Sequence, residues 1–219
     1  MQNPTETLIA HHLAYTFLSK VFYEPPTRDW IDTLITEALF DDFPLESAHP
    51  EVETGLKLLR QFCASWHEND LEALQHDYRR LFVGPGRLLA TPWESVYLSP
   101  DHLMFDVQTV QVRRAYQRYG MAIPNLNNEP DDHLGLELRF LAHLNALGLE
   151  ALNRNQPELL EGVIEGMRSF MSVHLLKWAP RCLRLVIVNA SSSYYVGCAH
   201  LALGTLIHTD ELLQVEAAR

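Results

Sequence analysis

The chain has 219 residues, of which 47% are hydrophobic and 21% are charged, so it can bury the core of an ordinary globular domain. Its 28 acidic and 17 basic residues give a net charge of −11. That balance argues against nucleic acid or anionic lipid as partners, because both require clustered Lys and Arg. An acidic chain attracts cationic partners, although solubility explains the charge equally well.

The cysteines and the N-terminal sequence indicate the compartment. Cys63, Cys182 and Cys198 lie far apart and form no CxxC pair, which argues against a disulfide framework and a zinc site and fits a reducing cytosol. The first residues show no basic region followed by an apolar block, so we expect no signal peptide. No run of about 18 apolar residues is present, so we expect a cytoplasmic protein without direct membrane insertion.

Hydrophobic residues recur at helical spacing along most of the chain. The segments with this pattern are 4–26, 27–40, 50–69, 70–84, 104–120, 129–147, 156–176, 180–190 and 192–213. The run "LRLVIVNA" is rich in β-branched residues, but its neighbours are helical and we assign it to a helix. The sequence therefore predicts an all-α protein of about eight or nine helices, with residues 1–219 forming a single domain.

A long connection near residues 83–97 interrupts the helical pattern. It holds Gly84, Pro85 and Gly86, a turn signal, and matches no phosphate-binding loop. Loops of this length are often functional. Trp93 and Tyr97 within it are either anchors tucked into the core or aromatic residues of a binding groove, and the sequence supports both equally.

The stretch "NEPDDHLG" gathers acidic residues ahead of a long apolar run. Pro130 suits the first turn of a helix, which Asn128 or Glu129 can cap. Asp131 and Asp132 would then lie at the positive end of the helix dipole. A helix from about residue 129 to residue 147 explains the whole cluster locally.

His133 needs a separate explanation. On such a helix it lies one turn from Glu129 and one turn from Glu137, and a neighbouring carboxylate would stabilise its charged form or fix its tautomer. The spacing is neither HExxH nor ExxH, so we predict no metal site. No activated Ser or Cys lies nearby in the sequence, so we predict no catalytic residue. Further along, His174 and Trp178 precede Pro180 and are typical of a helix end packed on a neighbour.

Four motifs, "YRRLFVGP", "PWESVYL", "NEPDDHLG" and "HLLKWAP", occur in this order. In them the sequence resembles the TorD/DmsD family of molybdoenzyme maturation chaperones and looks closest to the DmsD branch. The resemblance implies an all-helical cytoplasmic chaperone that is not an enzyme and needs no cofactor. It implies binding of the twin-arginine signal peptide of a molybdopterin oxidoreductase precursor, of DMSO reductase type, to assist folding and cofactor loading before Tat export. It also implies a monomer or a domain-swapped dimer, and guanine nucleotide as a ligand of some members.

The resemblance further implies a peptide-binding surface. Its residues are Tyr78, Phe82, Pro92, Trp93, Ser95, Tyr97, Glu129, Asp131, Asp132 and His133. Carboxylates suit this task because they bind guanidinium groups in a bidentate fork. Aromatic side chains suit the apolar segment that follows the two arginines of such a leader.

Two other functions stay open from the sequence. One is a NarJ-like assembly factor that acts on the body of the enzyme as well as on its leader. The other is a metal-dependent or nucleotide-dependent hydrolase that uses Asp132 and His133.

Overall fold

The computed structural model describes residues 3–45, 49–101, 103–122 and 129–217. Within these ranges the α-helices are α1 (Pro4–Tyr23), α2 (Arg28–Thr36), α3 (Pro50–Ser65), α4 (Leu71–Tyr78), α5 (Glu94–Leu98), α6 (Val107–Arg118), α7 (Leu134–Asn153), α8 (Pro157–Phe170), α9 (Leu176–Asn189) and α10 (Ser193–Ala217). A 3-10 helix, η1 (Glu68–Asp70), and two π-helices, η2 (Arg79–Val83) and η3 (Met171–Leu175), complete them. The all-α class is confirmed, because these residues form no strand and one isolated β-bridge, between Trp93 and His133. None of the helices they form is long and apolar enough to cross a membrane.

The helices α8, η3 and α9 form one uninterrupted helical stretch from Pro157 to Asn189. Counted in this way, the described residues contain nine α-helices, in agreement with the predicted number. The helix predicted for residues 180–190 is α9, but it begins four residues earlier, at Leu176, so Pro180 lies inside it and does not start it. Trp178 and Cys182, on either side of the proline, are fully buried, and their burial offsets the backbone hydrogen bond that a proline lacks.

The contacts divide the chain into two compact units. Unit 1 consists of Met1–Tyr23, Trp93–Ala179 and Thr209–Arg219; unit 2 consists of Glu24–Pro92 and Pro180–His208. That residues 1–219 form a single domain stays a prediction.

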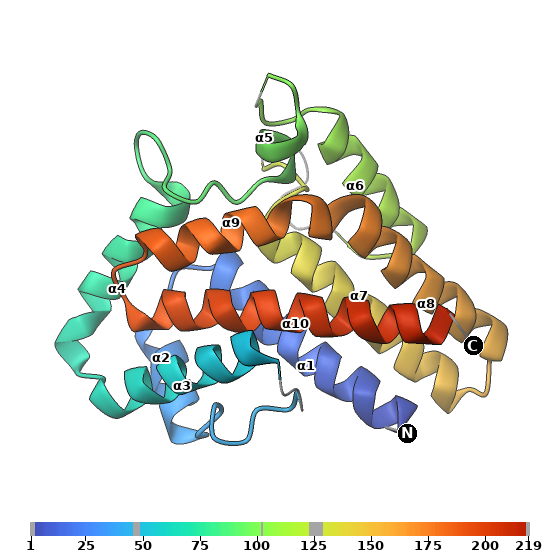
Figure 1. The fold of residues 1–219 in the computed structure, drawn as a ribbon, viewed down its shortest axis with the longest axis horizontal. Helices are drawn as coiled ribbons and strands as arrows, with labels where there is room; N and C mark the ends of the chain where they lie inside the picture. The colour runs from blue at the N-terminus through green and yellow to red at the C-terminus, as the bar shows by residue number, and fades with distance from the viewer. Residues whose placement is uncertain (1–2, 46–48, 102, 123–128, 218–219) are drawn as a thin grey trace. The chain divides into compact units, whose positions relative to one another are not determined.

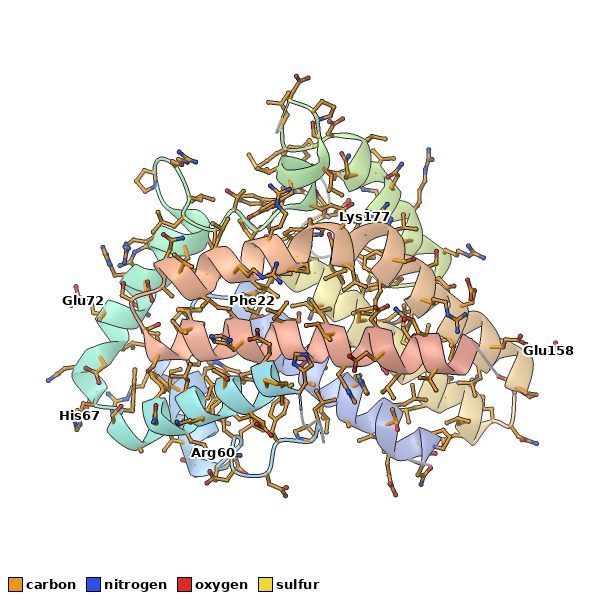
Figure 2. The ribbon with its side chains drawn as sticks, in the orientation of Figure 1. Phe22, Arg60, His67, Glu72, Glu158 and Lys177 are labelled. Atoms are coloured by element: carbon orange, nitrogen blue, oxygen red, sulfur yellow. The ribbon has the colours of Figure 1, made fainter. Side chains whose placement is uncertain are left out.

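In unit 1, α7 packs along α1 and against α8 (Figure 1). The start of α7 lies so close to the end of α1 that a Cβ atom on Gly135 would be 2.6 Å from Tyr23 Cβ. Only glycine allows this approach, which fixes where the helix begins. Figure 2 shows the charged side chains of Glu158 and Lys177 on the outside of this unit, whereas Phe22 is completely buried.

In unit 2, α3 crosses α10 at a similarly short distance. A Cβ atom on Gly55 would be 2.6 Å from Leu201 N and 2.8 Å from the carbonyl oxygen of Gly197. The apolar residues of α10 cover all its sides, which is typical of a buried helix rather than an amphipathic surface helix. These glycines let the backbones of the two helices meet directly.

Candidate functional site

The acidic stretch before α7 is not helical. α7 begins at Leu134, and His133 is its N-cap, with its Nδ1 accepting a hydrogen bond from Gly135 N–H at 3.0 Å. The predicted start of this helix at residue 129, with Pro130 in its first turn, is therefore wrong, whereas residues 134–147 are helical as predicted. Asn128 lies outside the described residues. Because residues 129–132 precede the helix, their side chains serve other elements of unit 1.

Asp132 is completely buried and holds α5 and α6 in place. Its Oδ2 accepts the backbone N–H of Ser95 at 2.7 Å, and its Oδ1 accepts the hydroxyl of Thr109 at 2.7 Å. Its carbonyl oxygen accepts the backbone N–H of Glu94 at 2.9 Å. The carboxylate thus satisfies the start of α5, not the start of its own helix as the sequence suggested. This contact spans 37 residues and cannot be read from local spacing.

Asp131 is also completely buried and turns towards α6. One carboxylate oxygen forms an ion pair with Arg113, and the backbone carbonyl accepts the hydroxyl of Tyr116 at 3.0 Å. The other oxygen, Oδ1, is buried without a hydrogen-bond partner among the described residues. Both aspartates therefore lie inside unit 1, where their bonds fix neighbouring backbone.

His133 lies between two aromatic rings. Its imidazole meets Tyr23 edge-on at 5.2 Å and Trp93 edge-on at 5.7 Å between centroids. Only 4% of the residue is exposed, and burial lowers the pKa of His133 to about 3. The expectation that a carboxylate stabilises its charged form is therefore wrong, because desolvation dominates and the ring is neutral near pH 7.

A second buried polar group lies beside α5, and the sequence analysis missed its acidic members. His174 Nδ1 is 3.0 and 3.1 Å from the two carboxylate oxygens of Glu94. Trp178 Nε1 donates a hydrogen bond of 3.2 Å to Glu137. Burial, and next the Glu94 carboxylate, raise the pKa of Glu137 well above its usual range. The sequence held one signal for this group: Glu94 lies among apolar residues in "PWESVYL", and a buried charge needs a partner.

The remaining predicted residues of unit 1 surround this centre. Ser95 is completely buried, whereas Trp93 and Tyr97 are half-buried and so belong partly to the core and partly to the surface. Tyr97 lies against Trp178, with 5.4 Å between ring centroids. Glu129 is half-buried and accepts the hydroxyl of Tyr23 at 2.9 Å. Unit 1 therefore brings together seven of the ten predicted residues.

The other three predicted residues belong to unit 2. Tyr78 and Phe82 are 5% and 2% exposed and pack edge-on, 5.4 Å apart, with Phe82 also 5.8 Å from Tyr195. Pro92 is buried as well. Next to Tyr78, the buried Asp77 accepts the backbone N–H groups of Ser191 and Ser192 just ahead of α10. That these residues contact a peptide stays a prediction.

An exposed apolar surface lies between α5 and the first turns of α6, and the sequence analysis missed it. We call it the apolar strip; its members and exposed fractions are Leu103 (60%), Met104 (48%), Phe105 (55%), Val107 (53%) and Val110 (45%). The sequence pattern placed residue 104 inside a helix, but Asp106 caps α6 by accepting Val107 N–H at 2.7 Å. Large apolar side chains so close together in water usually mark an interaction surface.

Among the described residues, no three His, Cys, Asp or Glu side chains are grouped so that they could hold a metal ion. Several buried polar atoms of the site lack hydrogen-bond partners within the same ranges, among them Trp93 Nε1, Ser95 Oγ and Asp131 Oδ1. Such groups cost free energy and are rare in native proteins, so their concentration marks a functional region.

Comparison with known proteins gives the family. Residues 45–184 match the family model "Nitrate reductase delta subunit". The "Probable Tat proofreading chaperone DmsD" of Haemophilus influenzae is 29% identical over 86% of this chain and 84% of its own length. The "Chaperone protein TorD" of Vibrio cholerae is 32% identical over 64% of each chain. A solved structure, a putative redox enzyme maturation protein from Archaeoglobus fulgidus, has a TM-score of 0.48 at 19% identity and covers 98% of this chain and 96% of its own.

The relatives are named as chaperones and not as enzymes, in agreement with the resemblance found in the motifs. The chain belongs to the nitrate reductase delta subunit family, the redox-enzyme maturation chaperones that include TorD and DmsD.

Proposed function

We propose that this protein is a Tat proofreading chaperone that binds the twin-arginine leader of a molybdoenzyme precursor of DMSO reductase type, and that unit 1 carries the binding surface. The observation that carries the proposal is the apolar strip, which follows the "PWESVYL" segment in the chain and continues onto α6, the helix that contacts α5. The names of the relatives support the same function.

A twin-arginine leader presents two guanidinium groups followed by an apolar segment. The strip offers the apolar half of a complementary surface, and covering half of a Leu or Phe side chain contributes about 1 kcal/mol. Three such residues would therefore contribute enough to change the affinity by about a hundredfold. The strip also lies in a chain of charge −11, which speeds encounter with a basic peptide.

The arginines need carboxylates that they can reach. Asp131 and Asp132 are fully buried and already bonded, whereas Asp101 is exposed and Asp106 and Glu129 are half-buried. We therefore assign the guanidinium contacts to the accessible carboxylates. In this proposal Asp131, Asp132 and His133 act on binding by holding α5 and α6 in position.

The test is calorimetry with leader peptides from the molybdoenzymes of the source organism, each beside a form with both arginines changed to alanine. The native protein should bind one leader, and the alanine form should bind at least tenfold more weakly. The triple variant Leu103→Ser, Met104→Ser, Phe105→Ser should weaken binding at least tenfold.

The matched control is Ile9→Ser, Leu13→Ser, Leu159→Ser, which removes three side chains of similar exposure elsewhere in unit 1. It should bind within twofold of the native protein. Equal affinities of the two triple variants would contradict the assignment to the strip. A precursor that still binds after deletion of its leader would favour a NarJ-like assembly factor.

Two further expectations from the resemblance belong to this proposal. Guanine nucleotide is to be titrated in the same calorimeter, with adenine nucleotide as control. The choice between a monomer and a domain-swapped dimer is to be read from the mass of the protein by light scattering.

A further inference from the structure

Unit 1 contains a cavity of about 210 Å³ beside the C-terminal half of α6. Its walls come from α6, α7, α8 and η3: Arg114, Ala115, Arg118, Tyr119, Phe140, Gly166, Ser169, Phe170, Val173 and His174. Arg114, Arg118 and Ser169 are exposed, so the rim is open to solvent, whereas Phe140 and Phe170 are buried.

The two arginines at the rim form no ion pair among the described residues; Arg118 lies over the adjacent Tyr119 ring, 5.8 Å from its centroid, as a cation–π contact. They lie four residues apart on α6, where like charges destabilise a helix. The sequence offers 28 acidic residues, yet within the described ranges no carboxylate pairs with Arg114 or Arg118, whereas Arg113 pairs with Asp131. The helix dipole favours a cation at Arg118 in the last turn but gives no reason for Arg114, a turn earlier.

The floor of the cavity is aromatic. Phe140 and Phe170 meet edge-on at 4.7 Å, and Tyr119 lies 5.9 Å from Phe140. Tyr119 can lie across α8 because residue 166 is glycine: a Cβ atom there would be 2.2 Å from its hydroxyl oxygen. That hydroxyl donates to the carbonyl of Gly162 at 3.1 Å, which fixes the ring. A cationic rim over an aromatic floor fits a ligand with an anionic head and an aromatic body.

His174 closes the inner end of the cavity. Its ring packs against Phe170, 5.0 Å between centroids, and its Nδ1 is held by Glu94. The imidazole therefore has a fixed orientation and supplies a third polar group to the cavity wall. We propose that this cavity is a binding site for a small aromatic anion, a phosphate or a carboxylate on a ring, whose head contacts Arg114 and Arg118 and whose ring rests on Tyr119, Phe140 and Phe170.

The proposal goes beyond leader binding and does not depend on it. Its test uses the full chain labelled with ¹⁵N-histidine, with the side-chain signals of His174 as reporter. The probes are phenyl phosphate, benzoate, inorganic phosphate and benzyl alcohol. We expect phenyl phosphate or benzoate to saturate the His174 shift at a concentration at least tenfold below inorganic phosphate and benzyl alcohol, and the stronger of the two identifies the head group.

The variant Arg114→Gln, Arg118→Gln should weaken phenyl phosphate binding at least tenfold. The control Arg139→Gln, Arg184→Gln removes two exposed arginines outside the cavity and changes the net charge equally, so it should bind within twofold of the native protein. Ser169→Trp keeps both arginines but fills the mouth from an exposed position, and it should abolish the shift while the melting temperature is retained.

The site assignment is overturned if the native protein shows no saturable shift with either aromatic anion. It is equally overturned if the two arginine variants weaken binding to the same extent, because the effect is then one of net charge. If Ser169→Trp does not fold, the arginine pair and its control still decide the question.

Discussion

The segment Asp131–His133 and the apolar strip are neighbours in unit 1, because Asp132 accepts a hydrogen bond from Thr109 of α6. Charged side chains are usually exposed and apolar side chains are usually buried, but these two regions show the reverse. The charged side chains Asp131 and Asp132 have no exposed surface, whereas Leu103 is 60% exposed. Buried carboxylates are tolerated where donors surround them, and they then fix backbone rigidly. Exposed apolar side chains contribute no hydrophobic stabilisation in the free protein, but they contribute to binding when a partner covers them. We infer that the first segment gives the site its shape and the second gives it affinity.

The largest expected effect tests the structural half of this comparison. Asp132→Ala leaves the Ser95 N–H and the Thr109 hydroxyl without their buried acceptor, so the free energy of unfolding should fall by about 3 kcal/mol. Urea denaturation measures it. Asp101→Ala, at an exposed aspartate, is the control and should change stability by less than about 0.5 kcal/mol. Equal stabilities of the two variants would show that the buried carboxylate is not structural.

The next effect concerns the helix start. Gly135→Ala places a Cβ atom 2.6 Å from Tyr23 Cβ and 2.9 Å from Tyr23 N, so α1 and α7 must separate. We expect a loss of about 2 kcal/mol in urea denaturation. The control, Gly162→Ala, lies inside α8 with no atom within 4 Å of the new Cβ, and should stabilise by about 0.5 kcal/mol. If Gly135→Ala and Gly162→Ala lowered the stability equally, close packing of α1 against α7 would not be the reason for glycine at position 135.

A smaller effect depends on pH. Burial lowers the pKa of His133 to about 3 in the folded protein, whereas an unfolded histidine titrates near about 6.5. The unfolded chain therefore takes up the proton first, and this contribution to stability is complete above pH 6.5 and is lost as the pH falls towards 3. Between pH 7.5 and 5.5 the loss is about 1.4 kcal/mol.

His133→Asn retains an oxygen that can accept Gly135 N–H and removes the titration. Urea denaturation at both pH values should show the variant losing about 1.4 kcal/mol less than the native protein over this range. The raised pKa of Glu137 acts in the opposite direction as the pH rises, and it is common to both proteins. Parallel pH profiles would contradict a buried neutral His133.

The smallest expected effect tests the apolar strip. Phe105 has a φ of 61°, a left-handed conformation that a non-glycine residue adopts at some cost. Phe105→Gly should therefore stabilise the protein by about 0.5 kcal/mol while it weakens leader binding. Ala38→Gly, at a φ of 47° in unit 2, is the matched control and should leave leader affinity unchanged. If Phe105→Gly lowered the stability, the Phe105 ring would be shown to stabilise the free protein by packing, contrary to its assignment as a binding residue.

Hydrophobic spacing predicted the helical class and most helices, because each helix records its buried face in its own sequence. The start of α7 could not be predicted in this way. Pro130 and two aspartates make a plausible first turn, but Asp132 instead bonds Ser95, 37 positions earlier, and this distant contact overrides the local signal. The strip was hidden for a related reason: Met104 and Phe105 begin the predicted helical segment 104–120, and periodicity does not report which side chains stay exposed.

Unit 1 has a consequence for how the protein is made, because its core joins segments from both ends of the sequence. The hydroxyl of Tyr15 lies 2.6 Å from that of Thr209, a buried contact between residues 194 positions apart. During synthesis, another 194 residues must follow Tyr15 before this contact can form, and contacts of such separation slow folding. A protein of a chaperone family thus emerges from the ribosome with its own apolar helices unprotected until the last segment of α10 arrives.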